Sequence, residues 1–83
     1  MRLEHIINKM RKSCIDEFNI HRLKWNNESF HPNKYVTMNL EKQEAIYDDN
    51  IDGGGSGYFS FYLDDIMAND WEEYKGEIYK PMF

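Results

Sequence analysis

The sequence is poor in the features that signal secretion, cross-linking or membrane insertion. Its 83 residues include one cysteine, Cys14, so a single chain cannot form an internal disulfide bond. No apolar run approaches the roughly 18 residues of a membrane-spanning helix, and no charged-then-apolar leader opens the chain. These absences predict a cytoplasmic protein without membrane contact. The length fits one domain, covering residues 1–83.

Groups of residues typical of enzymes and metal sites are also scarce. The three histidines have no metal-ligand spacing with one another or with Cys14, which falls on an apolar helical stripe. Asp48 with Asp49, and Asp64 with Asp65, are adjacent pairs, whose side chains would point to opposite faces of a strand. We therefore expect a non-enzymatic protein with no metal ion and no cofactor.

Charge is distributed unevenly along the chain. Residues 1–40 contain seven Lys and Arg against four Asp and Glu, a net +3, and residues 41–83 contain three against eleven, a net −8; the two sum to −5. This total disfavours binding of bulk nucleic acid. The acidic half is suited to a basic partner, so a DNA-mimic-like inhibitor or adaptor that binds a host protein is one functional hypothesis.

Aromatic residues are abundant, with two Trp, six Tyr and five Phe. A domain of this size buries only about two-thirds of its unfolded surface, so a lone monomer would be marginally stable. Large aromatic side chains also seal subunit contacts and stack on flat ligands. The composition therefore favours a homo-oligomer.

Hydrophobic periodicity predicts an α+β fold. Apolar residues recur at three- and four-residue steps over residues 2–17, which indicates a helix. Alternation with period two then predicts strands, of which 58–63 has the clearest pattern. The predicted strands are 19–25, 34–40, 45–51, 58–63 and 71–75, with one or two helical turns over 64–70 capped by Asp64. We expect the N-terminal helix to pack on a four- to five-stranded antiparallel sheet, with the short helix before the last strand.

The stretch IDGGGSGYF (51–59) places four of the five glycines within residues 53–57. Residues 48–53 match the first half of a calcium-binding loop, but its twelfth position, where a glutamate should stand, is Phe59. The spacings of phosphate-binding and dinucleotide-binding loops are not met either. The stretch is interpreted as a flexible hairpin connection, either natural or engineered. Residues 76–83 are interpreted as a tail.

Two motifs carry a family resemblance. The first is Ile20-x-Arg22-x-x-Trp25, and the second is Asp64-x-Ile66-Met67-Ala68-x-Asp70-Trp71. Together they resemble the Thoeris anti-defence 2-like domains, a family of small phage proteins, over residues 3–75 in element order. The chain departs from that pattern in a short, glycine-rich middle and in the segment DEFN (16–19), which stands where a glycine usually ends the helix. The resemblance implies a non-catalytic sponge that sequesters a cyclic dinucleotide or cyclic ADP-ribose type of immune signal between subunits.

The chemistry of particular residues fits such a ligand. Trp25, Trp71 and Tyr35 offer flat surfaces on which a nucleobase stacks, and the forked donors of Arg22 suit a phosphate. Asp70 and Asn39 offer acceptors to ribose hydroxyls or exocyclic amines. A structural interpretation stands beside this one: the tryptophans fill the core or an interface, and Arg22 pairs across the sheet with Asp70 or Glu73.

Overall fold

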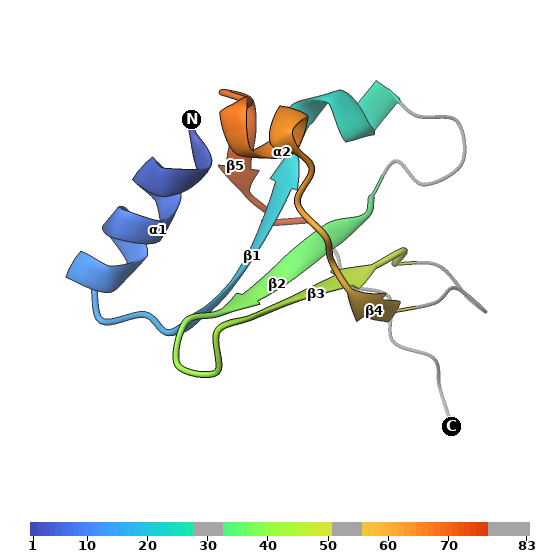
Figure 1. Cartoon of the computed structure of the whole chain (residues 1–83). Helices are drawn as coiled ribbons and strands as arrows, with labels where there is room; N and C mark the ends of the chain where they lie inside the picture. Colours follow the sequence, from blue (N-terminus) through green and yellow to red (C-terminus); the bar gives the residue numbers. More distant parts are fainter. Residues whose placement is uncertain (28–32, 51–55, 77–83) are drawn as a thin grey trace.

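The computed structural model describes residues 1–27, 33–50 and 56–76. In these ranges a helix, α1 (Leu3–Lys12), lies beside a five-stranded antiparallel sheet of order β4-β3-β2-β1-β5 (Figure 1). The α+β prediction, including a short helix before the last strand, is confirmed. The other elements are β1 (Glu17–Arg22), the 3-10 helix η1 (Leu23–Asn27), β2 (Tyr35–Asn39), β3 (Glu44–Asp48), β4 (Ser56–Tyr58), α2 (Leu63–Met67) and β5 (Trp71–Glu73).

Helix α1 turns its apolar side to the sheet, and Ile6 and Met10 are each only 2% exposed. The predicted end of this helix is wrong, because the helix ends at Lys12 rather than near residue 17. Cys14 takes a left-handed conformation, with φ 57°, and the Ile15 N–H donates to the Met10 carbonyl at 2.9 Å. This is the hydrogen-bond pattern that commonly closes a helix with glycine. Cys14 is exposed and follows the helix, so its predicted place on the apolar helical stripe is also wrong.

The inner strands bury one face against α1. Ile20 on β1 is paired with Val36 on β2, and neither is exposed to solvent. On the other side of β1, Arg22 is paired with Trp71 of β5. This register places the first sequence motif directly beside the end of the second.

Two predicted strands are shorter than their alternating patterns indicate. The strand predicted over 19–25 ends at Arg22, and η1 follows it. The strand predicted over 58–63 pairs with β3 only through Ser56–Tyr58, with one further bond from the Phe59 N–H to the Ala45 carbonyl. Residues 59–62, here called the crossing segment, then leave the sheet. Phe59 and Phe61 pack against the core cluster without pairing with a strand. Their burial accounts for the alternating apolar pattern that predicted a strand here.

Strands β3 and β4 are antiparallel neighbours, as a hairpin connection requires, but Ser56 and Gly57 of the glycine-rich stretch pair with β3 as part of β4 instead of lying in the connection. Residues 51–55 of that stretch, and residues 77–83 of the predicted tail, lie outside the described residues.

Candidate functional site

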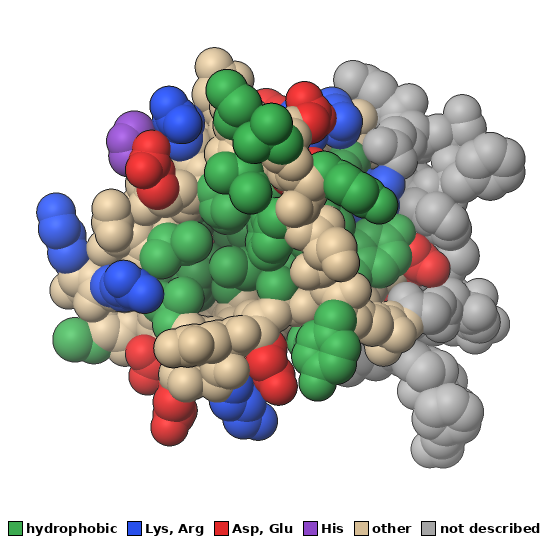
Figure 2. Space-filling model, in the orientation of Figure 1, with side chains coloured by type: hydrophobic (Ala, Val, Ile, Leu, Met, Phe, Trp, Pro, Cys, Tyr) green, Lys and Arg blue, Asp and Glu red, His purple; other side chains and the backbone are tan. Residues whose placement is uncertain are grey.

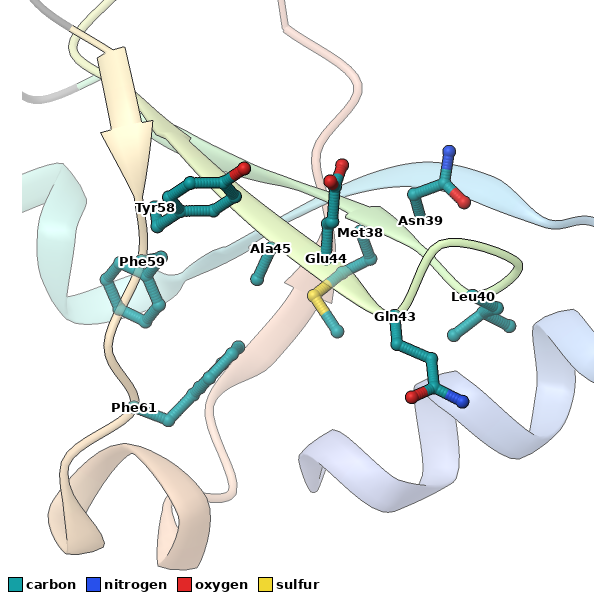
Figure 3. Close-up of a pocket in the computed structure, with 9 residues that line it drawn as sticks. All are labelled: Met38, Asn39, Leu40, Gln43, Glu44, Ala45, Tyr58, Phe59 and Phe61. Carbon is teal, nitrogen blue, oxygen red and sulfur yellow. The ribbon is translucent and has the colours of Figure 1, made fainter.

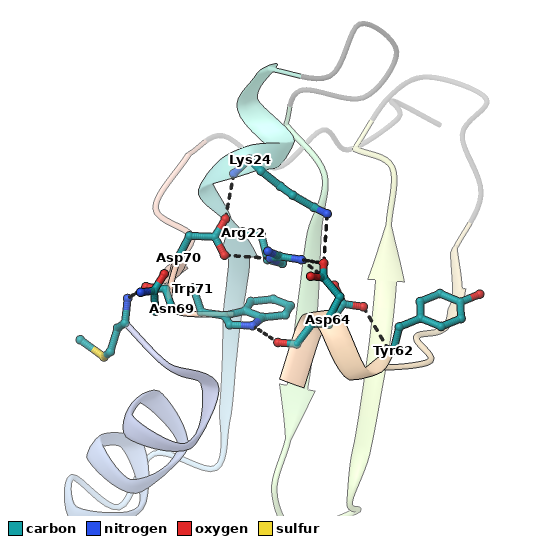
Figure 4. Close-up of polar contacts among 9 residues, drawn as sticks. Arg22, Lys24, Tyr62, Asp64, Asn69, Asp70 and Trp71 are labelled. Atoms are coloured by element: carbon teal, nitrogen blue, oxygen red, sulfur yellow. Dashed lines mark hydrogen bonds and ion pairs between the residues drawn. The ribbon is translucent and has the colours of Figure 1, made fainter. Parts of the chain in front are cut away.

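The two motifs meet at one ionic cluster, the Arg22 cluster, formed by Arg22, Asp64, Asp65 and Asp70 (Figure 4). The Nε–H of Arg22 donates to Asp70 Oδ1 at 2.8 Å, and Nη1 donates to Asp64 Oδ2 at 2.9 Å and to Asp65 Oδ1 at 3.0 Å. Lys24 adds a backbone N–H bond to Asp70 and an ammonium contact of 3.4 Å to Asp64. The guanidinium is thus held by strand β1 against the first turn of α2 and the residue before β5.

Burial and charge act against each other in this cluster. Burial alone would lower the pKa of Arg22, but hydrogen bonds to Asp70, Asp64 and Asp65 outweigh it and raise that pKa. Burial would likewise raise the pKa of Asp70, but the hydrogen bonds from Arg22 and the Lys24 backbone lower it. The pKa of Asp64 is lowered by its bonds to Arg22 and then to Lys24. The side chain of Arg22 is 8% exposed and that of Asp65 is 11% exposed, whereas that of Asp64 is 75% exposed.

The two tryptophans of the motifs lie in the core beside this cluster. Trp25 is 5% exposed and Trp71 is fully buried, and their rings meet edge to face at 5.5 Å. The Trp71 indole N–H donates to the Asp65 carbonyl at 2.6 Å, which ties β5 to α2. The ammonium of Lys34 lies 5.1 Å from the centre of the Trp25 ring, a cation–π distance. Within one chain, the flat faces of both indoles are therefore covered by protein.

The remaining predicted site residues lie elsewhere. Tyr35 is 5% exposed and stacks on Tyr74 at 5.0 Å, and its pKa is raised by burial and then by Asp48. Asn39, at the opposite end of β2, accepts the Lys42 N–H at 2.9 Å. The structure thus brings Arg22, Trp25, Asp70 and Trp71 together and leaves Tyr35 and Asn39 apart from them.

Within one chain, the contacts of Arg22 match the structural interpretation, in which the tryptophans fill the core and Arg22 pairs with a carboxylate. Arg22 pairs with Asp70, whereas Glu73 lies 3.8 Å from Lys75. Sequence reasoning missed the part played by Asp64 and Asp65, which were placed on a strand or at a helix cap. The predicted cap at Asp64 is wrong: the N-cap of α2 is Tyr62, and the Asp65 carboxylate accepts the Tyr62 N–H at 3.1 Å. The signal available in the sequence was the carboxylate pair opening a short helix.

An apolar hollow opens on the face of the molecule that carries α1. In the orientation of Figure 1, Figure 2 shows apolar side chains gathered around it at the centre of the view. The hollow has a volume of about 350 Å³, and its apolar wall consists of Met38, Leu40, Ala45, Phe59 and Phe61. Figure 3 shows these side chains lying between the β2–β3 hairpin, the crossing segment and α1.

Helix α2 and the residues before it expose further apolar surface. Tyr62 is 75% exposed, Leu63 71%, Met67 64% and Ile66 49%. Contiguous exposed apolar residues of this kind mark contact surfaces more often than isolated ones do. A second groove, along α1, is lined in part by His5, Lys9 and Lys12. No Asp or Glu is among the described residues that line this groove, so its lining is basic.

Comparisons with family models, curated proteins and solved structures found no match to this chain. Among the helices of the described ranges, none has the length and apolar character needed to cross a membrane. Across residues 1–27, 33–50 and 56–76, no three His, Cys, Asp or Glu side chains are grouped so as to hold a metal ion.

Proposed function

We propose that this protein is a non-catalytic binding protein that sequesters a nucleotide-derived signal, of the cyclic dinucleotide or cyclic ADP-ribose type, as a phage anti-defence sponge. One observation carries the proposal. The two motifs behind the family resemblance meet through hydrogen bonds of Arg22 to residues 42 to 48 positions away. This convergence supports treating the two motifs as one unit built around Arg22.

The Arg22 cluster serves this function as a frame. The Nε and Nη1 donors of Arg22 and both indoles are occupied within one chain, so we place the ligand contacts on the surfaces that the frame supports. The groove along α1 supplies cations for phosphates through Lys9 and Lys12, with His5 beside them. We further propose that the protein acts as a homo-oligomer in the host cytoplasm, where a second copy adds to these contacts.

Calorimetry and native mass spectrometry against a panel of cyclic dinucleotides and cyclic ADP-ribose isomers test this function. At least one compound should bind with a fixed ratio of ligand to chain and be released unchanged on denaturation. The double variant Lys9→Gln and Lys12→Gln should weaken binding about tenfold or more, because hydrogen bonds to charged groups contribute about 1.5–3 kcal/mol. Lys42→Gln, at an exposed turn, is the matched control. If folded protein binds no compound of the panel, the proposal is refuted.

A second candidate is an inhibitor or adaptor that binds a host protein. The exposed apolar residues of α2, Leu63, Ile66 and Met67, favour it. The acidic half favours it less than its charge suggests, because three carboxylates of that half already pair with Arg22. Capture from host lysate should then yield one protein that withstands high salt and is lost with Leu63→Ser and Met67→Ser together. Capture that disappears in salt, and is indifferent to these substitutions, would contradict an apolar interface.

A further inference from the structure

The apolar hollow exists because the crossing segment leaves the sheet early. Strand β4 pairs with β3 only through Ser56–Tyr58, and the bond from Phe59 to Ala45 is the last contact of that ladder. Helix α1 lies on the other side and contacts β5. The strip of sheet between them, over Met38 and Ala45, is left without a covering element in the described residues (Figure 2).

The aromatic wall of the hollow is held in place from behind. Phe59 and Phe61 meet edge to face at 4.8 Å, at an interplanar angle of 83°. The ring centres of Phe59 and Trp25 are 5.9 Å apart, and those of Phe61 and Trp71 are also 5.9 Å apart. Because both tryptophans are buried, the wall is fixed before any guest arrives, which lowers the entropy cost of binding.

The floor and the size of the hollow suit a flat ring system. Figure 3 shows the Met38 side chain extending between Ala45 and Gln43, beside the rings of Phe59 and Phe61 in this view. A thioether is polarisable, adapts its shape and makes favourable contacts with aromatic rings. The volume of about 350 Å³ falls within the range of small-molecule sites, about 300–1,000 Å³.

The rim of the hollow carries a negative charge. Its polar lining residues are Asn39, Gln43, Glu44 and Tyr58, so Glu44 is the one charged residue among those that line it. Figure 3 shows the Glu44 carboxylate on the sheet face opposite to Met38 and Ala45, so a group bound in the hollow reaches it over the edge of β3. Gln43 is exposed, and the Oδ1 of Asn39 already accepts the Lys42 N–H. A carboxylate at the rim without a lysine or arginine in the lining attracts an amine or a cation and repels an anion.

We propose that this hollow binds a planar aromatic compound carrying an amino group. Its rings lie against Phe59, Phe61 and Met38, and its amine extends to the carboxylate of Glu44 over the part of the β3 edge that no other described residue pairs with. The site stands apart from the proposed nucleotide function, because no lysine or arginine of the described residues lines it to neutralise a phosphate.

Two three-ring probes of opposite charge test the site. 9-Aminoacridine is planar and cationic, and anthracene-9-carboxylate has the same ring outline with a negative charge. In a fluorescence titration, 9-aminoacridine should bind and the carboxylate should bind at least about tenfold more weakly, since contact with Glu44 changes from attraction to repulsion. Equal affinity for the two probes would overturn the assigned sign.

Variants locate the bound probe. Glu44→Gln should weaken 9-aminoacridine about two- to fivefold, as expected for an exposed ion pair. Glu41→Gln makes the same charge change at an exposed position outside the hollow and should leave affinity within twofold. Ala45→Phe fills the hollow and should reduce affinity at least about tenfold. Equal effects of the two glutamate substitutions, or full binding by folded Ala45→Phe, would overturn the site.

A spectroscopic measurement on the unmodified chain covers the case in which Ala45→Phe does not fold. Methyl NMR spectra should show ring-current shifts at Met38 and Leu40 when 9-aminoacridine is added. The methyl group of Met67, on exposed α2, serves as the internal control and should not move. Shifts at Met67 without shifts at Met38 would place the probe on α2 and refute the proposal. Because the probe lacks phosphate, this outcome is independent of the nucleotide panel.

Discussion

Replacing Arg22 with methionine should be among the most damaging single substitutions in the chain. The change keeps a long apolar side chain but leaves Asp65 buried, and Asp70 largely so, without a cation. Removing one partner of a buried ion pair costs about 3–5 kcal/mol. The bond to Asp64 adds little, because that carboxylate is mostly exposed and such pairs contribute about 0–1 kcal/mol. At about 0.05–0.15 kcal/mol per residue, a domain of 83 residues has a total of roughly 4–12 kcal/mol to lose.

Urea unfolding followed by circular dichroism at pH 7 measures this loss. Arg22→Met should lower the free energy of unfolding by about 3–5 kcal/mol, and the melting temperature by roughly 12 °C or more. Arg22→Lys keeps the charge but loses the fork that reaches three carboxylates, so its loss should be smaller but clear. The difference in free energy of unfolding between the wild type and Arg22→Met should become smaller as pH falls toward about 4, because a protonated carboxyl group no longer needs a cation.

The matched carboxylate variants decide whether burial sets these magnitudes. Asp70→Asn, at a side chain 24% exposed, should cost clearly more than Asp64→Asn, at one 75% exposed. An Arg22→Met loss below about 1 kcal/mol, in the range of exposed pairs, would refute the role of the cluster as a frame. Equal costs for the two asparagine variants would refute the ranking by burial.

Three further outcomes follow from the same contacts. The pKa values of Asp64 and Asp70 are held below the ordinary value of about 3.9, so their contribution to stability is present above that value and is lost as pH falls through the lower folded pKa. Melting temperatures should therefore decline from pH 6 to pH 2. A melting temperature that does not change over this range would contradict the pKa shifts. Trp71→Phe removes the indole bond to the Asp65 carbonyl and should cost about 1–3 kcal/mol in urea unfolding, with near-neutrality counting against that bond. Cys14→Gly should stabilise the chain by up to about 1 kcal/mol, because Cys14 is left-handed, whereas Ser13→Gly, at φ −90°, should not; stabilisation by both would exclude this cause.

The order of elements was predictable because helical and strand periodicities separate faces, whatever the tertiary context. Element ends were not predictable in the same way. Helix α1 ends at a left-handed cysteine, a residue type that gives no stop signal. The crossing segment alternates like a strand because Phe59 and Phe61 point to the core, yet it forms no ladder beyond Phe59 within the described residues. Alternation reports which side chains are buried and does not report whether a neighbouring strand is present.

The candidate site shows a similar division. Pairing of Arg22 with Asp70 was one of two interpretations open from the sequence, and the structure contains that pair. The shared role of Asp64 and Asp65 was missed, because adjacent carboxylates diverge on a strand. On the first turn of α2 the two carboxylates instead reach the same Nη1 of Arg22. Which geometry applies depends on a helix of five residues, too short for periodicity to define.

The two motifs would therefore specify a structural frame rather than a ligand. Arg22 and Trp71 are buried within one chain, and they position the crossing segment through contacts such as that of Phe61 with Trp71. The surfaces proposed to bind a small molecule are formed by residues outside both motifs, Phe59 and Glu44 among them. Chains with the same two motifs but different residues at these positions should share the fold and differ in what they bind. Exchanging Glu44 for lysine should accordingly reverse the charge preference of the hollow and leave the frame intact.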